Sequence, residues 1–193
     1  MTVSFTLGVA MSLHWSFLPE CDMTTGLEAE ARELLVLAFP NHADFFRKTS
    51  FRGSVPEYRL FGRDLEGNLY AHIECGPRVA SANGQAVRIL GIGSVAVHPA
   101  AQRRGIGREM FARLRTYAIK HQLADFGFLE CREAVVGFYQ RAGLERVAQP
   151  CTSVHHDTGK LETYHGPVMV MPLLLPMREW PRGGEVNLNG MSW

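Results

Sequence analysis

The segment VAVHPAAQRRGIGREM, residues 95–110, constrains the fold of this chain more than any other segment. It begins with apolar residues in the pattern of a strand, passes through a turn with two glycines and three arginines, and continues at helical spacing. The unpaired N–H groups and the macrodipole at a helix N-terminus favour a bound anion. The turn at 102–108 therefore predicts a phosphate-binding loop between a strand and a helix.

The remaining sequence predicts one mixed α/β domain. Residues 13–18 read as a strand, and Thr25 with Glu28 three residues later reads as a capping box that opens a helix. Asn83-Gly84 predicts a hairpin turn, and further helices are expected at 105–121 and before Gly143. The segments 144–154 and 166–176 look like a final antiparallel pair of strands.

Composition excludes several classes of function. The chain has 193 residues, is 46% hydrophobic and has a formal net charge of +1, which argues against a dedicated nucleic-acid binder. The four cysteines form no CxxC pair, so no metal site is expected. No apolar run is long enough to span a bilayer, and a cytoplasmic protein is expected. Residues 1–10 read as a loose extension of a domain at 11–193.

The arginines and glycines of the turn suit a pyrophosphate. Gly105 and Gly107 allow close approach of the backbone to an anion, and Arg103, Arg104 and Arg108 add charged donors. The turn is not a Walker loop, because no Gly-Lys-Ser/Thr follows, and it lacks the third glycine of a dinucleotide fingerprint. An ordinary solvated turn before an amphipathic helix is the alternative.

Two blocks of sequence resemble the Gcn5-related N-acetyltransferase (GNAT) superfamily. Gln102, Gly105 and Gly107 match its Q/R-x-x-G-x-G/A turn, and the later FYQRAGL block at 138–144 matches its second motif. The resemblance implies an α/β domain whose sheet is mixed and mostly antiparallel, with a splayed central pair of strands and flanking helices. It also implies acetyl-CoA as cosubstrate, without a metal. The residues implied to bind it are Val95, Ala96, Val97, Gln102, Arg103, Arg104, Gly105, Ile106, Gly107, Arg108 and Arg132, the last replacing an asparagine of many members.

The same resemblance assigns catalytic roles. Backbone groups of Val95 and Val97 would hold the pantetheine arm and polarise the thioester carbonyl, which suits a strand with free N–H groups. Tyr139 would protonate the leaving thiolate, and a core tyrosine is the alternative. A base must accept the proton of the amine, and Glu130 is the first candidate. The carboxylates considered for this role are Asp44, Glu57, Glu74, with His72 beside it, Glu130 and Asp157.

The segments 42–62 and 177–193 resemble a smaller branch of the superfamily. This branch holds the aminoglycoside 2'-N-acetyltransferases, including the kasugamycin type, and the rhizobial nodulation N-acyltransferase, which act on an amino sugar. The resemblance implies that the tail 177–193 packs at the acceptor site and places the carboxylate of Trp193 there; a frayed tail is the alternative. The residues expected to bind the acceptor are Asp44, Glu74, Trp180 and Trp193.

The basic turn favours acetyl-CoA as donor, so the leading hypothesis is acetylation of an aminoglycoside, kasugamycin above all, which would confer antibiotic resistance. The alternatives are an acyl-carrier-dependent N-acyltransferase of the nodulation type and a non-catalytic acyl-CoA-binding module. A homodimer is compatible with the resemblance. His155, His156 and Asp157 are expected to form a polar turn rather than a metal site, because neighbouring residues of a strand point in opposite directions.

Overall fold

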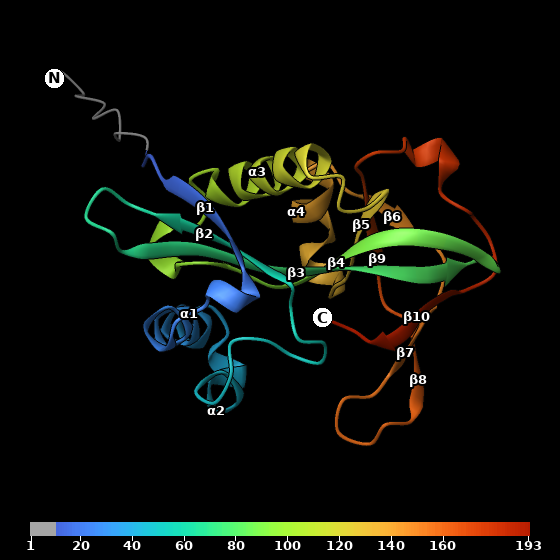
Figure 1. Ribbon diagram of the computed structural model, residues 1–193, viewed down its shortest axis with the longest axis horizontal. Helices are drawn as coiled ribbons and strands as arrows, with labels where there is room; N and C mark the ends of the chain where they lie inside the picture. The colour runs from blue at the N-terminus through green and yellow to red at the C-terminus, as the bar shows by residue number, and fades with distance from the viewer. Residues whose placement is uncertain (1–10) are drawn as a thin grey trace, which may run out of the picture.

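The computed structural model describes residues 11–193, and the extension expected at 1–10 lies outside the described residues. These residues form a mixed, mostly antiparallel sheet flanked by helices, so the predicted fold class is confirmed (Figure 1). The main helices are α1 (Thr25–Ala38), α2 (Ala43–Phe46), α3 (Ile106–Lys120) and α4 (Val136–Arg141). The strands are β1 (His14–Pro19), β2 (Tyr58–Arg63), β3 (Leu69–Ala82), β4 (Gln85–Val97), β5 (Phe126–Glu130), β6 (Glu145–Val147), β7 (Cys151–Val154), β8 (Leu161–Tyr164), β9 (Val168–Pro172) and β10 (Val186–Met191).

The sheet opens in its middle, between β4 and β5. Its strand order is β6-β9-β5-β4-β3-β10-β7-β8, with β2 also paired to β3 and β1 to β2. The two central strands run parallel but pair only where residues 89–91 face residues 126–128. Beyond this point β4 continues to Val97 while β5 turns away and ends at Glu130. The splayed pair expected from the family resemblance is therefore present, and it leaves one edge of β4 without a neighbouring strand.

The long β3–β4 hairpin forms the centre of the sheet. Its turn is Asn83-Gly84, with φ of 47° and 74°, as the primed hairpin turns require. The predicted turn is confirmed. Further along, the register slips between His72 and Glu74, where Ser94 adopts a φ of 44°. This β-bulge bends β4 where it leaves β5 and turns the Ser94 side chain toward the opening.

Helix α1 starts one residue earlier than its sequence motif suggests. Its N-cap is Thr24, whose Oγ1 accepts a hydrogen bond from the Leu27 amide at 3.2 Å. Glu28 does not close a capping box with Thr25. Its carboxylate instead binds both the amide and the hydroxyl of Ser50. A tertiary contact thus replaces the expected local one.

The helices cover the two faces of the sheet unequally. In Figure 1, α3 and α4 lie on one side and α1 and α2 on the other. Under α3 lies the largest apolar cluster, which includes Phe111 and Leu114, both fully buried. A smaller cluster joins α1, α2 and Ala96 of β4. The two helical layers therefore enclose the opening between β4 and β5 from opposite sides.

The C-terminal third is more strand-rich than the sequence indicated. The expected pairing of 144–154 with 166–176 holds for β6 and β9, but Pro150 separates β6 from β7. Strand β7 pairs instead with β8 and with β10, which the sequence analysis missed. Strand β10 bridges β7 and β3 and brings the tail back toward the middle of the sheet. No helix among residues 11–193 is long and apolar enough to cross a membrane.

Candidate active site

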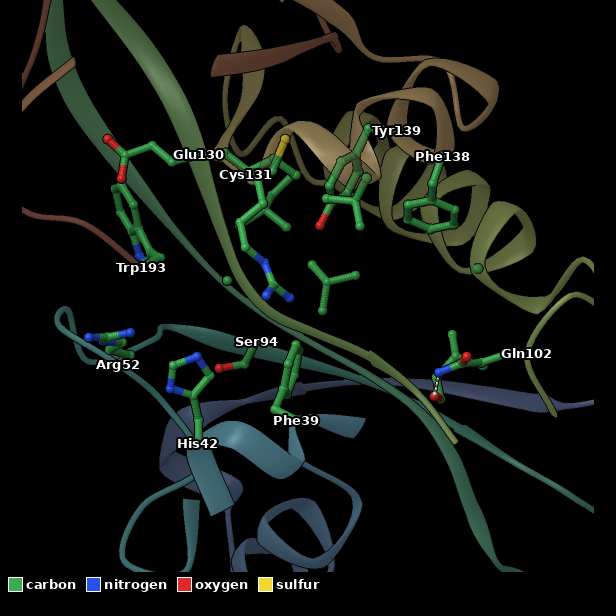
Figure 2. Close-up of a pocket in the computed structure, with 18 of the residues that line it drawn as sticks. Phe39, His42, Arg52, Ser94, Gln102, Glu130, Cys131, Phe138, Tyr139 and Trp193 are labelled. Carbon is green, nitrogen blue, oxygen red and sulfur yellow. Dashed lines mark hydrogen bonds between the residues drawn. The ribbon is translucent and has the colours of Figure 1, made fainter. Parts of the chain in front are cut away.

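A cavity of about 800 Å³ occupies the opening between β4 and β5. This volume is in the range of small-molecule sites. One end is formed by the loop before α3, the middle by β4 and α4, and the other end by α2, Arg52 and Trp193 (Figure 2). The loop before α3 and the tail, far apart in sequence, thus line one continuous space.

The loop before α3 presents an unbroken set of free amides. The first hydrogen bond of the helix runs from the Glu109 amide to the Gly105 carbonyl at 3.1 Å. Among the described residues, the amides of 103–108 have no hydrogen-bond partner. Gly105 is the N-cap of α3 with a φ of 84°, which glycine adopts without strain, and Arg103 is also left-handed. Together with the helix dipole, this geometry suits an anion with several oxygens.

Three arginines surround these amides. Arg103, Arg104 and Arg108 make no ion pair within residues 11–193, and the first and last line the cavity. Gln102 points back to the strand, where its Nε2 donates to the Val97 carbonyl at 3.1 Å (Figure 2). Its role is to fix the loop on β4, while the arginines provide the charge.

Gly107 has a packing role that the motif does not reveal. A Cβ on this residue would lie 2.6 Å from Cε2 of Phe138, so a side chain here would push α4 away from α3. The two glycines of the turn therefore serve different purposes. Gly105 allows the backbone turn, and Gly107 allows the two helices that flank the cavity to approach.

The free edge of β4 faces the cavity. The His98 amide donates to the Tyr70 carbonyl at 2.8 Å on the β3 side, and amides along a strand alternate between its two edges. The amides of Val97 and Val95 therefore point to the side that β5 has left, as expected. Both side chains line the cavity. Ala96 and Ile106, also expected there, are buried in apolar clusters and can contribute only backbone groups.

Tyr139 lies in the middle of the cavity wall. Its ring packs edge-on against Phe111 and Phe138, and its hydroxyl points into the open space (Figure 2). Burial raises the pKa of Tyr139 well above that of free tyrosine, so the phenol stays protonated at neutral pH. The ring of Tyr139 is thus part of the core, while its protonated hydroxyl faces the cavity. Arg132, from the turn after β5, lines the same wall.

Trp193 is docked on the sheet at the end of the cavity opposite the loop before α3. The Trp193 indole lies over Gly91, where a Cβ would come within 2.1 Å of its ring, and over Gly76 on the neighbouring strand. The Arg78 guanidinium stacks on the ring at 4.0 Å from its centroid. The Ser54 amide donates to the Ser192 carbonyl at 2.9 Å. These contacts favour a docked tail over a frayed one.

Beneath the bulge of β4 lies a buried charged network centred on Arg59. Its guanidinium is fully buried and donates to both carboxylate oxygens of Glu20, at 2.7 and 2.9 Å, and to Ser50 Oγ at 2.8 Å. The same group lies 3.3 Å from Nε2 of His72 and 3.7 Å from Oε2 of Glu74. Burial, with Arg59 nearby, lowers the pKa of His72 to about 3, so its imidazole is neutral.

The candidate bases lie at different depths. Glu130 lines the cavity, and burial raises the pKa of its carboxyl group. Glu74 is fully buried beside the cavity, and burial raises its pKa to about 8 despite Arg59. It reaches the cavity only through Ser94, whose hydroxyl donates to Glu74 Oε1 at 2.9 Å. Glu57 and Asp157 are exposed and do not line the cavity.

Two residues expected at the acceptor site lie elsewhere. Asp44 is exposed on α2 and paired with Arg47, because its position on the helix faces solvent. Trp180 is buried in the apolar cluster that includes Phe126 and Phe128 of β5, where it packs on Phe126 and donates to Gln149 at 2.7 Å. Both expectations are corrected, since neither side chain lines the cavity.

Several residues that line the cavity were not predicted from the sequence. Ser94 was part of an ordinary strand pattern, and its positive φ has no signature in a single sequence. The aromatic end of the cavity comes from a segment without clean periodicity. The additional lining residues there are Phe39, His42, Phe45, Phe46 and Arg52.

The β7–β8 hairpin carries the two adjacent histidines. Residues 155–160 form its turn, as expected. The expectation that His155 and His156 point in opposite directions was wrong. Their rings stack with centroids 4.8 Å apart and point the same way. His155 Nδ1 accepts hydrogen bonds from the amides of Asp157 and Thr158, which stabilises the turn.

Comparison with solved structures identifies the fold. The GNAT-family N-acetyltransferase YhbS of Escherichia coli, solved in complex with CoA, aligns with a TM-score of 0.59 over 93% of this chain and 91% of its own, at 15% sequence identity. ElaA of Escherichia coli aligns with a TM-score of 0.56 over 82% of this chain and 99% of its own, at 13% identity. The chain therefore has the GNAT fold that its two motifs implied.

Sequence comparison is more specific. Nodulation protein A of Bradyrhizobium sp. (strain ANU 289) is 29% identical over 160 residues, which cover 78% of this chain and 75% of the relative. Nodulation protein A of Methylobacterium nodulans is 26% identical over 199 residues, covering 95% and 92%. Family and fold together support an acyltransferase of the GNAT type. Because the family model "Nodulation protein A (NodA)" matches residues 10–192, the chain belongs to the nodulation protein A family.

Proposed function

We propose that this protein transfers an acyl group from a coenzyme A thioester to the amino group of an amino sugar, with acetyl-CoA as donor. The observation that carries the proposal is the set of free amides at 103–108 with three unpaired arginines, at the mouth of a cavity that continues along the free edge of β4. Amides and guanidinium groups are suited to a diphosphate. The free edge of β4 is suited to the amide-containing pantetheine arm, which follows the diphosphate in coenzyme A.

The reacting groups would meet near Tyr139. The amides of Val95 and Val97 face the cavity and can donate to the thioester carbonyl as negative charge develops on its oxygen. The protonated hydroxyl of Tyr139 points into the same space and can protonate the leaving thiolate. This arrangement supports direct transfer, without a covalent intermediate on the protein.

The acceptor would bind at the end formed by α2, Arg52 and Trp193. The indole of Trp193 offers an apolar face for a sugar ring, and the carboxylate of Glu130 can pair with a cationic amine. The resemblance of segments 42–62 and 177–193 to enzymes that act on amino sugars supports an acceptor of this class. Kasugamycin, the acceptor expected at first, belongs to the same chemical class and is a competing acceptor in the test. A homodimer stays a prediction.

The donor half of the proposal is tested by acetyl-CoA and the acceptor half by a panel of amines. Acetyl-CoA at 100 times its Kd should stabilise the fold by about 2.7 kcal/mol and raise the melting temperature by several degrees. Release of free CoA should then depend on glucosamine, a de-N-acetylated chitin oligosaccharide or kasugamycin. Absence of a thermal shift with millimolar acetyl-CoA contradicts the donor. A shift without CoA release for any amine leaves a binding module.

Replacing Trp193 by alanine should raise the KM for the amino sugar about tenfold or more. The indole forms part of the cavity wall, and a loss of about 1.4 kcal/mol of contact energy corresponds to a factor of ten. The thermal shift with acetyl-CoA should not change, because the donor loop lies at the other end. Steady-state kinetics with varied amino sugar measure the effect.

Trp180→Phe is the matched control for this prediction. Trp180 is buried in the core, so this variant should lower the melting temperature through the lost bond to Gln149 without changing the KM. An unchanged KM for Trp193→Ala, or equal changes in both variants, would show that the tail does not contact the acceptor.

A further inference from the structure

Ser94 connects the cavity to a buried carboxyl group. It lies at the bulge of β4 with a φ of 44°, and its side chain lines the cavity. Its hydroxyl donates to Glu74 Oε1 at 2.9 Å, and its carbonyl accepts a hydrogen bond from Nδ1 of His72 at 3.0 Å. Because both ends of Ser94 are held by β3, the hydroxyl has a fixed position between Glu74 and the cavity.

The neighbouring groups compensate only in part for the burial of the Glu74 carboxyl group. The side chain is fully buried, and Oε2 has no hydrogen-bond partner among the described residues. The nearest cation, Arg59 on β2, lies at 3.7 Å and already pairs closely with Glu20. A buried carboxyl group in this setting takes up a proton more readily than an exposed one. Burial raises the pKa of Glu74 to about 8, so it exchanges its proton near neutral pH.

The groups that face Glu74 come from every neighbouring element. Besides Arg59, the Arg52 amide and the Ser94 hydroxyl favour the carboxylate, while Glu20 disfavours it. The backbone of Trp193 also lies close. A Cβ on Gly93 would be 2.5 Å from Glu74 Oε1 and 2.7 Å from the backbone carbonyl carbon of Trp193. The Glu74–Ser94 pair therefore lies directly beside the proposed acceptor end of the cavity.

We infer that Ser94 and Glu74 remove the proton that the acceptor ammonium must lose before it attacks the thioester. This inference rests on the proposed function. The ammonium passes one proton to Ser94 Oγ while Ser94 passes its own proton to Glu74 Oε1. The neutral amine then attacks, the C–N bond forms and the C–S bond breaks. The thiolate takes the proton of Tyr139, the second amine proton restores Tyr139, and Glu74 later releases its proton to solvent.

Ser94 and Glu74 have different roles in this proposal. Ser94 lines the cavity and can touch the amine, whereas Glu74 acts through Ser94. Glu130, the rival base, lies on the opposite wall, at the end of β5. If Glu74 is the proton acceptor, kcat for wild type rises with pH and levels off above about 8, because only the ionised carboxylate accepts a proton.

The kinetic test compares Glu74→Gln, Ser94→Gly and Glu130→Gln with wild type, using acetyl-CoA and the amino sugar that the wild type accepts. Glycine at 94 tolerates the positive φ and removes the whole CH2OH side chain, the hydroxyl included. Glu74→Gln and Ser94→Gly should each lower kcat about a hundredfold at pH 7.5, with the KM for acetyl-CoA unchanged. In both, kcat should keep rising with pH beyond 8. In Glu130→Gln, whatever the values of kcat and KM, the pH at which kcat levels off should be that of the wild type. A plateau that persists in Glu74→Gln and disappears in Glu130→Gln overturns the inference.

A second measurement does not depend on turnover. The infrared spectrum of the wild type should contain the band of a neutral carboxylic acid at pH 6 that disappears by pH 9 and is absent from Glu74→Gln. A Glu74 that is ionised throughout this range overturns the inference even if the enzyme is active. If wild type releases no CoA with any amine, the proposed function fails instead, and the infrared result still decides the proton exchange of Glu74.

Discussion

Replacing Arg59 by methionine is expected to lower the free energy of unfolding by about 3–5 kcal/mol, the cost of removing one partner from a buried ion pair. Arg59 is fully buried and holds Glu20, Ser50 and Glu74 together beneath the bulge of β4. Without it, these polar groups are left in a low-dielectric interior without their main donor. Urea or thermal denaturation at pH 7 measures the loss.

Arg146→Met is the matched control for Arg59→Met. Arg146 on β6 pairs with Glu133 at 2.7 Å, but both side chains are largely exposed. Exposed pairs contribute at most about 1 kcal/mol, so this variant should unfold almost as the wild type does. Equal losses in the two variants would show that the Arg59 network does not hold the fold together.

Replacing Tyr139 by phenylalanine is expected to lower kcat by about a hundredfold or more, because general acid catalysis typically contributes factors of this size. The ring contacts with Phe111 and Phe138 are retained, and only the hydroxyl that points into the cavity is lost. The affinity for acetyl-CoA should therefore stay the same. The measurement is kcat for the amino sugar beside the thermal shift with acetyl-CoA.

The melting temperature of Tyr139→Phe provides its own control. The hydroxyl of Tyr139 makes no hydrogen bond within the described residues, so the stability of Tyr139→Phe should change little. Unchanged turnover in Tyr139→Phe would show that Tyr139 has only a packing role in the core beside Phe138.

The geometry of the proposed donor side could be predicted from sequence because local chemistry determines it. A strand, a left-handed glycine and a helix N-terminus follow one another between Val95 and Arg108, so the anion-binding geometry needs no distant partner. The sequence did not reveal that Gly105 and Gly107 have different roles. Gly107 accommodates Phe138, which lies about thirty positions later and whose contact with α3 is purely tertiary.

The acceptor side was predicted less well because distant segments build it. Trp193 reaches the cavity only because β10 pairs with β3, and glycines on β3 and β4 leave room for the indole. Asp44 and Trp180 had suitable chemistry in the same segments but face solvent and core, respectively. The bulge at Ser94 depends on the register of β3 against β4, which a strand pattern does not specify.

The most direct test of the account is a crystal structure of the protein with bound acetyl-CoA. We expect the diphosphate to lie on the amides of residues 103–108 with Arg103 or Arg108 in contact. The thioester carbonyl should face the Val95 and Val97 amides, and the sulfur should lie next to the Tyr139 hydroxyl. A cofactor bound elsewhere, or a diphosphate that leaves these amides without a contact, would contradict it.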